Sequence, residues 1–196
     1  MANIGTYTDQ QSIDRVATTA RGFEGWRPGV YDIWIRSNED QVDAFDDKGY
    51  TFVVPAAGAA PEFRMVCSGT TNAGSYGLKK FSNYNPDGCA VLQSDRIVYD
   101  SHKWGFHKGY RAYEQQKPFP YYRDADRDNK AEEIGEVHND IIKANLHCAA
   151  KGTGRVSVRI YNWSVACVVR NSFNQWAGWF AYMNRRPVSL CILQEF

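Results

Sequence analysis

Residues 30–36, Val-Tyr-Asp-Ile-Trp-Ile-Arg, decide the fold class, because the sequence changes there to a period of two. That period is typical of a β-strand, whose successive side chains point to opposite faces. Short segments of the same kind follow, separated by turns rich in Gly, Pro, Asn and Asp. We therefore expect a mainly β (α+β) fold with roughly ten short strands.

The expected strands begin after residue 29 and continue almost to the end of the chain. We place them at residues 30–36, 41–45, 50–54, 63–67, 90–92, 96–99, 119–123, 141–146, 156–161 and 188–193. Residues 46–49 and the glycine-punctuated segment 102–109 are expected to be turns or loops. Residues 110–116 are expected to form one or two helical turns.

One helix is expected on each side of the strands. Thr8 or Asp9 can cap a first helix that runs to about Ala20, with apolar residues at helical spacing. Ser172 can cap a second helix, and the spacing of its apolar residues places four of them on one face: Phe173, Trp176, Ala177 and Phe180. We divide the chain into an N-terminal helical segment, 1–29, and a β-rich domain, 30–196.

Size and composition exclude several classes of protein. The chain has 196 residues, of which 43% are hydrophobic and 23% charged, as in one ordinary globular domain. The formal net charge of +1 argues against a nucleic-acid binder, which usually carries a basic excess. No apolar run approaches the length of a membrane span, and the N-terminus lacks the blocks of a secretory signal. We expect synthesis in the cytoplasm without a signal peptide.

A cysteine nucleophile is the leading interpretation of Cys167. The chain has five cysteines, so at least one thiol has no disulfide partner. His147 ends an apolar strand upstream, and a nearby imidazole can lower the pKa of a thiol and take its proton. The alternative is that Cys167 is a small, inert residue buried in an apolar strand, and that His147 is a hydrogen-bonded strand-end histidine.

Four further residues are candidates for the same site. Ser164 would support the loop before the nucleophile or contact the oxyanion, unless it is a plain turn serine. The backbone N–H groups of Ala166 and Cys167 are natural oxyanion donors. His107 and Trp163 would line the substrate groove; the alternatives are a surface loop histidine and a packed tryptophan. Cys148 would point away from the face of His147.

The sequence predicts neither a metal ion nor another cofactor. It contains no Cys-x-x-Cys pair and no His-Glu-x-x-His motif. Residues 124–129 begin like a calcium-binding loop, but position six is Asn129 and position twelve is Gly135. We expect a solvated acidic turn there.

Several segments together resemble the YkuD-type L,D-transpeptidase family and its phage and bacterial cell-wall-hydrolase-like relatives. Asn145-Leu-His147 resembles the end of the family's histidine strand, and Ser164-Val-Ala-Cys167 resembles its Ser-x-Gly-Cys motif. Upstream, the segments Thr70-Thr-Asn-Ala-Gly74 and Trp104-Gly-Phe-His-Lys-Gly109 resemble two further family segments in the same order. Tyr122-Arg-Asp124 resembles a third.

The resemblance implies a cysteine peptidase or transpeptidase that forms an acyl-enzyme with peptidoglycan stem peptides. Cys167 would be the nucleophile, His147 its base and Ser164 a loop support, with His107 lining the site. We expect a phage lysin-like hydrolase acting on the cell wall or carried in a virion. Ala166 and Val168, which replace the family's Gly and polar residue, favour an alternative: a non-catalytic virion or peptidoglycan-binding module. A left-handed backbone at Ala166 would be strained.

Overall fold

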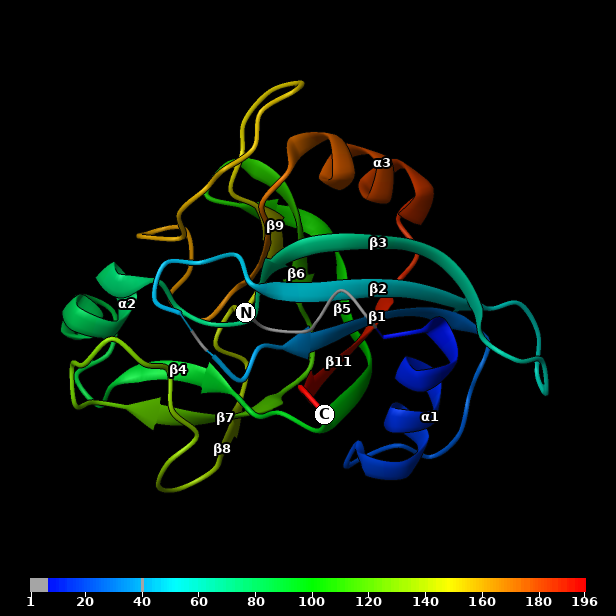
Figure 1. The fold of residues 1–196 in the computed structure, drawn as a ribbon, viewed down its shortest axis with the longest axis horizontal. Helices are drawn as coiled ribbons and strands as arrows, with labels where there is room; N and C mark the ends of the chain where they lie inside the picture. Colours follow the sequence, from blue (N-terminus) through cyan, green and yellow to red (C-terminus); the bar gives the residue numbers. More distant parts are fainter. Residues whose placement is uncertain (1–6, 40) are drawn as a thin grey trace.

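A closed β-barrel and a smaller sheet make up the fold in the computed structural model, which describes residues 7–39 and 41–196 (Figure 1). Within these residues the fold is mainly β with three α-helices, which confirms the coarse fold class. Residues 1–6, where we expect no secretory signal, lie outside the described part. No helix of the described part is long and apolar enough to cross a membrane.

Eight strands close the barrel, and their order around it differs from their order in the sequence. Around the barrel they are β1 (Gly29–Arg36), β11 (Val188–Gln194), β5 (Arg96–His107), β6 (Tyr110–Gln115), β9 (Leu146–Cys148), β10 (Val168–Arg170), β3 (Glu62–Thr70) and β2 (Asp47–Val54). The smaller sheet consists of β4 (Cys89–Leu92), β7 (Phe119–Asp124) and β8 (His138–Asp140).

Strand β1 lies where the sequence predicts the first strand. It pairs antiparallel with β2 and parallel with β11, so the first and last strands of the barrel are neighbours. Every residue of β1 after Gly29 is buried. Both faces of the strand are therefore covered, so the period of two in the sequence does not correspond to one exposed face.

The N-terminal helix α1 (Asp9–Thr19) also agrees with the prediction. Thr8 and Gln11 form a capping box at its start. Val16 is fully buried and belongs to the same apolar cluster as Ile33 and Leu193 of the barrel. The helical segment is therefore packed against the barrel and shares its core.

Helix α3 (Phe173–Met183) follows strand β10, as predicted. The Ser172 side chain caps its first turn, and Asn184 ends it in the left-handed conformation. Trp176 and Trp179 are buried against the barrel, where Trp179 packs edge-on against Tyr113 of β6. Trp176 also belongs to the wall of the cavity described below, together with Phe173 and Phe180 of the same helix.

The prediction of helical turns at residues 110–116 is wrong, as is that of a loop through residues 102–107. Strands β5 and β6 form one hairpin, closed by the pair His107 and Tyr110. Lys108 and Gly109 both have positive φ, 49° and 83°, which is the geometry of a two-residue hairpin turn. The hairpin places His107 at a turn, close to the end of β9.

Three other predicted elements are also absent from the described residues. Residues 41–45 form a turn around Asp43, which has a φ of 63°, and β2 already begins in the predicted turn at 46–49. Residues 156–161 form an irregular loop with a single bridge between Val156 and Ser172. Residues 141–145 are irregular too, so that β9 contains only Leu146–Cys148.

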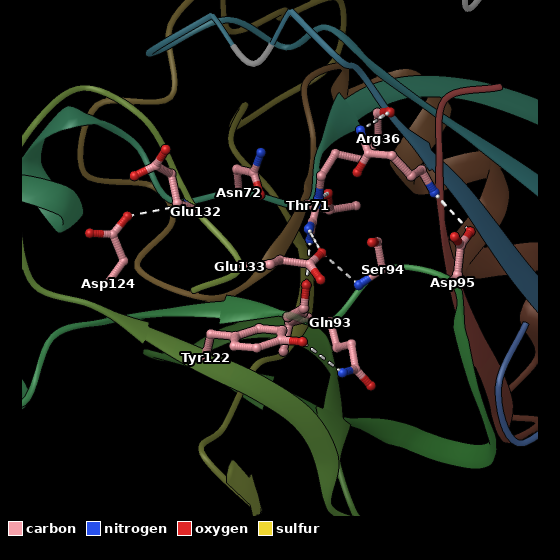
Figure 2. A network of polar contacts seen from close by, with 12 residues as sticks. Arg36, Thr71, Asn72, Gln93, Ser94, Asp95, Tyr122, Asp124, Glu132 and Glu133 are labelled. Carbon is pink, nitrogen blue, oxygen red and sulfur yellow. Dashed lines mark hydrogen bonds and ion pairs between the residues drawn. The ribbon is translucent and has the colours of Figure 1, made fainter. Parts of the chain in front are cut away.

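A buried polar network joins the barrel to the smaller sheet (Figure 2). The Arg36 guanidinium donates to the hydroxyl of Thr71, the carbonyl of Leu92 and the carboxylate of Glu133. Glu133 in turn accepts from the backbone N–H of Ser94 at 2.7 Å. Because the three partners of Arg36 come from three separate segments, Arg36 fixes the smaller sheet against the end of β1.

Candidate functional site

Parallel pairing of β9 with β10 brings the predicted base and nucleophile together. Val169 is the register partner of His147, and Cys167 lies two residues before Val169. His107, at the end of β5, reaches the same place. One nitrogen of each histidine and the Cys167 sulfur all lie within 4.8 Å of one another.

The Cys167 thiol is buried, with only 7% of the residue exposed. It packs with Ala149 and Val169 and lies 3.7 Å from the Lys143 carbonyl, to which it donates. Burial raises the pKa of Cys167 to about 11, although a hydrogen bond from the Asn145 backbone opposes the shift. The resting sulfur is therefore a neutral thiol, not the thiolate that the sequence led us to expect.

His147 is also buried and neutral. Burial, the adjacent His107 and Lys108 together lower the pKa of His147 to about 3. Its Nδ1 lies 3.4 Å from the Cys148 carbonyl, so we assign the proton to Nδ1. Its Nε2 is buried without a hydrogen-bond partner, although the Trp163 backbone is close enough to favour protonation slightly. This nitrogen is free to accept a proton.

The two histidine rings are stacked. Their centroids are 4.6 Å apart and their planes differ by 6°. His107 is half-buried and is held at Nδ1 by the Asn145 side-chain amide at 3.1 Å. The Asn145 Oδ1 in turn accepts from the backbone N–H of Gln115.

Asn145 is thus a positioning residue that the sequence analysis quoted only as part of a motif. Its amide fixes His107, its backbone contacts the Cys167 sulfur, and its carbonyl accepts from Val168 at 3.1 Å. The pattern Asn-x-His was the available signal.

The loop before Cys167 is a tight, buried turn. Ser164 Oγ donates to the Cys167 carbonyl at 2.8 Å, and the Ser164 carbonyl accepts from Gly74. A Cβ on Gly74 would lie 2.2 Å from the Tyr161 carbonyl, so only glycine allows this close approach. Ala166 is not among the described non-glycine residues with positive φ, so the alanine is accommodated without that strain.

Asp43 anchors the segment that leads into this turn. Its carboxylate accepts from the Ser75 N–H and hydroxyl and from the Tyr161 N–H, at 2.7–2.8 Å. Although burial opposes the effect, these hydrogen bonds hold the pKa of Asp43 below its usual value. The sequence analysis missed this residue because it placed Asp43 in a strand.

A cavity of about 790 Å³ opens beside the histidines. Its wall combines the predicted apolar face of α3 with loop and hairpin residues: His107, Lys108, Tyr110, Arg111, His147, Cys148, Ala150, Lys151, Gly152, Asn162, Trp163, Phe173, Trp176, Ala177, Phe180 and Ala181. None of these is acidic, and three are Lys or Arg. Such a wall suits an anionic ligand with apolar groups.

Cys167 itself does not belong to the cavity wall, whereas His107 and His147 do. The two rings therefore separate the sulfur from the cavity. Trp163 is half-buried and lines the cavity beside Lys151, whose ammonium lies 5.5 Å from its ring centroid. Cys148 also lines the cavity, and it packs against the core cluster that contains Leu146, whereas Cys167 packs with Val169, the register partner of His147.

Among the described residues, two groups have the composition of a cation site. One is His107, His147 and Cys167; the other is Asp126, Asp128 and Glu132. In the second group both aspartates are exposed, and their carboxylates accept backbone N–H groups of the same turn. That arrangement agrees with the expected solvated acidic turn.

Comparison with known proteins found no matching family model, no matching curated protein and no matching solved structure.

Proposed function

We propose that this protein is a cysteine-dependent peptidoglycan hydrolase of the YkuD type, which cuts stem peptides through an acyl-enzyme. The observation that carries the proposal is the proximity of Cys167 and His147 beside a large cavity. The motifs around both residues support the choice of substrate. The proposed place of action is the bacterial cell wall, reached from a phage particle or from within the host.

The chemistry begins from the neutral pair. His147 Nε2 takes the Cys167 proton as the sulfur attacks the carbonyl carbon of the scissile bond. The backbone N–H groups of Ala166 and Cys167 are assigned to the resulting oxyanion. The His147 imidazolium then protonates the departing amine, and the carbon–nitrogen bond breaks. Water, activated by the same imidazole, releases the acyl group and restores the thiol.

Substrate must reach a sulfur that the histidine rings cover. His107 is the wall residue best placed to move, because it is half-buried and directly precedes a two-residue turn. A rotation of its ring would open a path from the cavity to Cys167. His147 is only 4% exposed and stays in place as the base.

The cavity suits a stem peptide chemically. Lys108, Arg111 and Lys151 line it without any acidic counterpart among the described lining residues. Stem peptides carry free carboxylates, which these cations would hold. The aromatic face of α3 would contact the aliphatic parts of the peptide.

The test is digestion of purified sacculi in the presence of a chelator, with released fragments identified by mass spectrometry. Wild type and Cys148→Ala should release the same new peptide termini, while Cys167→Ala should release none above background. An added D-amino acid should remain unincorporated if water is the acceptor. Equal release by wild type and Cys167→Ala would refute the proposal.

A non-catalytic peptidoglycan-binding module is the second candidate. The buried sulfur favours it, since Cys167 is outside the cavity wall and its pKa is raised to about 11. In that case wild type and Cys167→Ala would sediment equally with sacculi, and neither would release fragments.

A further inference from the structure

The histidine–cysteine group has the donor set of a zinc site as well as that of a thiol enzyme. Imidazole nitrogen and cysteine sulfur are the ligands that Zn²⁺ prefers in proteins. The three donor atoms come from three separate segments of the barrel: the end of β5, strand β9 and the residue before β10. A rigid frame of this kind holds ligands without needing the ion to fold it.

One atom of the group lacks a hydrogen-bond partner. The Nε2 of His147 is buried and makes no hydrogen bond, which is a cost that proteins normally avoid. A ligand that accepts the lone pair of this nitrogen removes the cost. A proton or a metal ion can do so, and the nearby sulfur favours the metal.

The present arrangement is close to a metal site but does not yet have its geometry. Zinc bonds of about 2.0–2.3 Å in a tetrahedron place the ligand atoms about 3.3–3.6 Å apart, whereas here they lie within 4.8 Å. The two imidazoles are stacked with planes 6° apart, so their in-plane lone pairs cannot meet at one ion. One ring must turn.

His107 is the ring that can turn. It is half-buried beside the cavity, and among the described hydrogen bonds its ring makes one, to Asn145 at 3.1 Å. His147 is enclosed by the Cys148 carbonyl and the stacked ring. The cavity wall contains both histidines, so an ion can enter from the cavity. Three protein ligands leave a fourth position for water or an anionic ligand.

We propose that His107, His147 and Cys167 bind one Zn²⁺ ion with an open fourth position toward the cavity, and that this ion blocks the thiol chemistry. Forming the zinc–sulfur bond releases the thiol proton to solvent and occupies the sulfur lone pair needed for attack. The chain would then exist in a metal-free reactive form and a zinc-bound silent form.

Cobalt is the probe that tests this site directly. Chelator-treated, full-length protein is titrated with Co²⁺, and the absorption spectrum is followed for a sulfur-to-cobalt charge-transfer band and for intense visible bands of four-coordinate Co²⁺. We expect one Co²⁺ per chain, displaced by one equivalent of Zn²⁺. Cys167→Ser should lose the charge-transfer band, and His147→Gln and His107→Gln should each bind about a hundredfold more weakly, because one of three ligands is gone.

Cys148→Ser is the matched control, because this second thiol lines the same cavity. It should bind Co²⁺ like wild type. The inference is overturned if the wild type shows no charge-transfer band, or if the band persists in Cys167→Ser and disappears in Cys148→Ser. Circular dichroism of each variant shows whether a lost band reflects a lost ligand or a lost fold. Because His107 is only half-buried, His107→Gln is the variant least expected to disturb the fold.

The spectroscopic readout separates this inference from the proposed hydrolase. A cobalt band with no sacculus digestion in chelator would support the metal site and refute the hydrolase. Digestion by chelator-treated protein, after the chelator has been removed, that is unaffected by a stoichiometric amount of Zn²⁺ would refute the metal site alone.

Discussion

Strand β10 has a buried polar group at each end, and the two groups differ in whether they adjoin open space. At the C-terminal end of β10, the Arg170 guanidinium is fully buried and donates to both carboxylate oxygens of Asp32, at 2.6 and 2.8 Å. The Trp179 ring lies 4.0 Å from the guanidinium carbon. Two opposite charges therefore neutralise each other in a closed, aromatic surrounding.

Just before the other end, Cys167 and His147 form a neutral group with an unpartnered nitrogen. This group adjoins a cavity, whereas Asp32 and Arg170 have no exposed surface. The difference teaches that burial alone does not distinguish a structural group from a reactive one. Unpartnered atoms do not distinguish them either, because Nε and Nη1 of Arg170 also lack a hydrogen-bond partner. Contact with open space does.

Removing one charge of the buried Asp32–Arg170 pair should have the largest effect on stability. Asp32→Ala leaves the Arg170 charge buried and unpaired, and we expect a loss of about 3–5 kcal/mol in the free energy of unfolding. Chemical denaturation measures it. The double variant Asp32→Leu with Arg170→Met should lose less than Asp32→Ala alone, since neither buried charge remains.

Glu62→Ala is the control for that experiment, because it removes a carboxylate from the exposed Arg64–Glu62 ion pair. Its effect should be far smaller. Equal effects of Asp32→Ala and Glu62→Ala would show that burial of the Asp32–Arg170 pair does not raise the cost of breaking it.

A buried histidine with partners on both nitrogens sharpens the comparison with His147. His102 Nε2 lies 2.8 Å from the Ala144 carbonyl, and its Nδ1 lies 2.8 Å from Ser101 Oγ. Burial lowers the pKa of His102 to about 4. Because an unfolded histidine titrates near 6.5, the unfolded state binds a proton first as the pH falls.

Stability should therefore decrease from about pH 6.5 down to about pH 4, by up to about 1.4 kcal/mol per pH unit from this residue. His102→Gln should flatten that part of the stability curve measured by urea unfolding. His138→Gln, at a half-exposed position in β8, serves as the control and should leave the slope unchanged. An unaltered slope in His102→Gln would contradict the prediction.

The two thiols near the cavity should differ in reactivity. Cys148 lines the cavity and is partly exposed, while Cys167 is buried with a pKa raised to about 11. Iodoacetamide should label Cys148 first at neutral pH, and labelling of Cys167 should rise about tenfold per pH unit toward pH 11. Peptide mass spectrometry distinguishes the sites. Labelling of Cys167 first at pH 7 would mean that the sulfur is more open than this structure has it.

A small effect is expected at the cavity mouth. Lys151 donates to the Tyr110 hydroxyl at 2.7 Å and lies 4.1 Å from its ring centroid. Lys151→Met keeps the apolar stem but removes the charge, so a soluble anionic stem peptide should bind about two- to fivefold more weakly. Tryptophan fluorescence reports the binding. Lys103→Met, outside the cavity wall, should bind like wild type, and a similar loss there would point to a general charge effect.

The sequence predicted correctly those elements whose local pattern is strong, such as a capped helix or a bounded apolar strand. Strand β1, helix α1 with its Thr8 cap and helix α3 with its Ser172 cap were all placed correctly. Strand β6 was missed because its residues favour a helix locally, whereas pairing across the Lys108–Gly109 turn makes it a strand. Closure of the barrel lies beyond a single sequence, since it depends on pairs far apart in the chain.

The sequence identified which types of residue form the site, but not their ring stacking or their protonation states. The spacing brought His147 and Cys167 to attention, and the two side chains do lie together. The spacing could not predict the stacking of the His107 ring or the raised pKa of Cys167, because both depend on burial by distant segments. The sequence also did not predict the two lysines of the cavity, Lys108 and Lys151. The hairpin that carries Lys108 and the loop that carries Lys151 meet only in the folded chain.

The neighbouring positions of β1 and β11 have a consequence for biosynthesis. Strand β11 lies between β1 and β5, so the barrel has a gap until residues 188–194 are in place. Strand β1 must therefore wait until residues 188–194 have been made before it finds its parallel neighbour. Until then the half-made barrel exposes unpaired strand edges, which chaperones can shield.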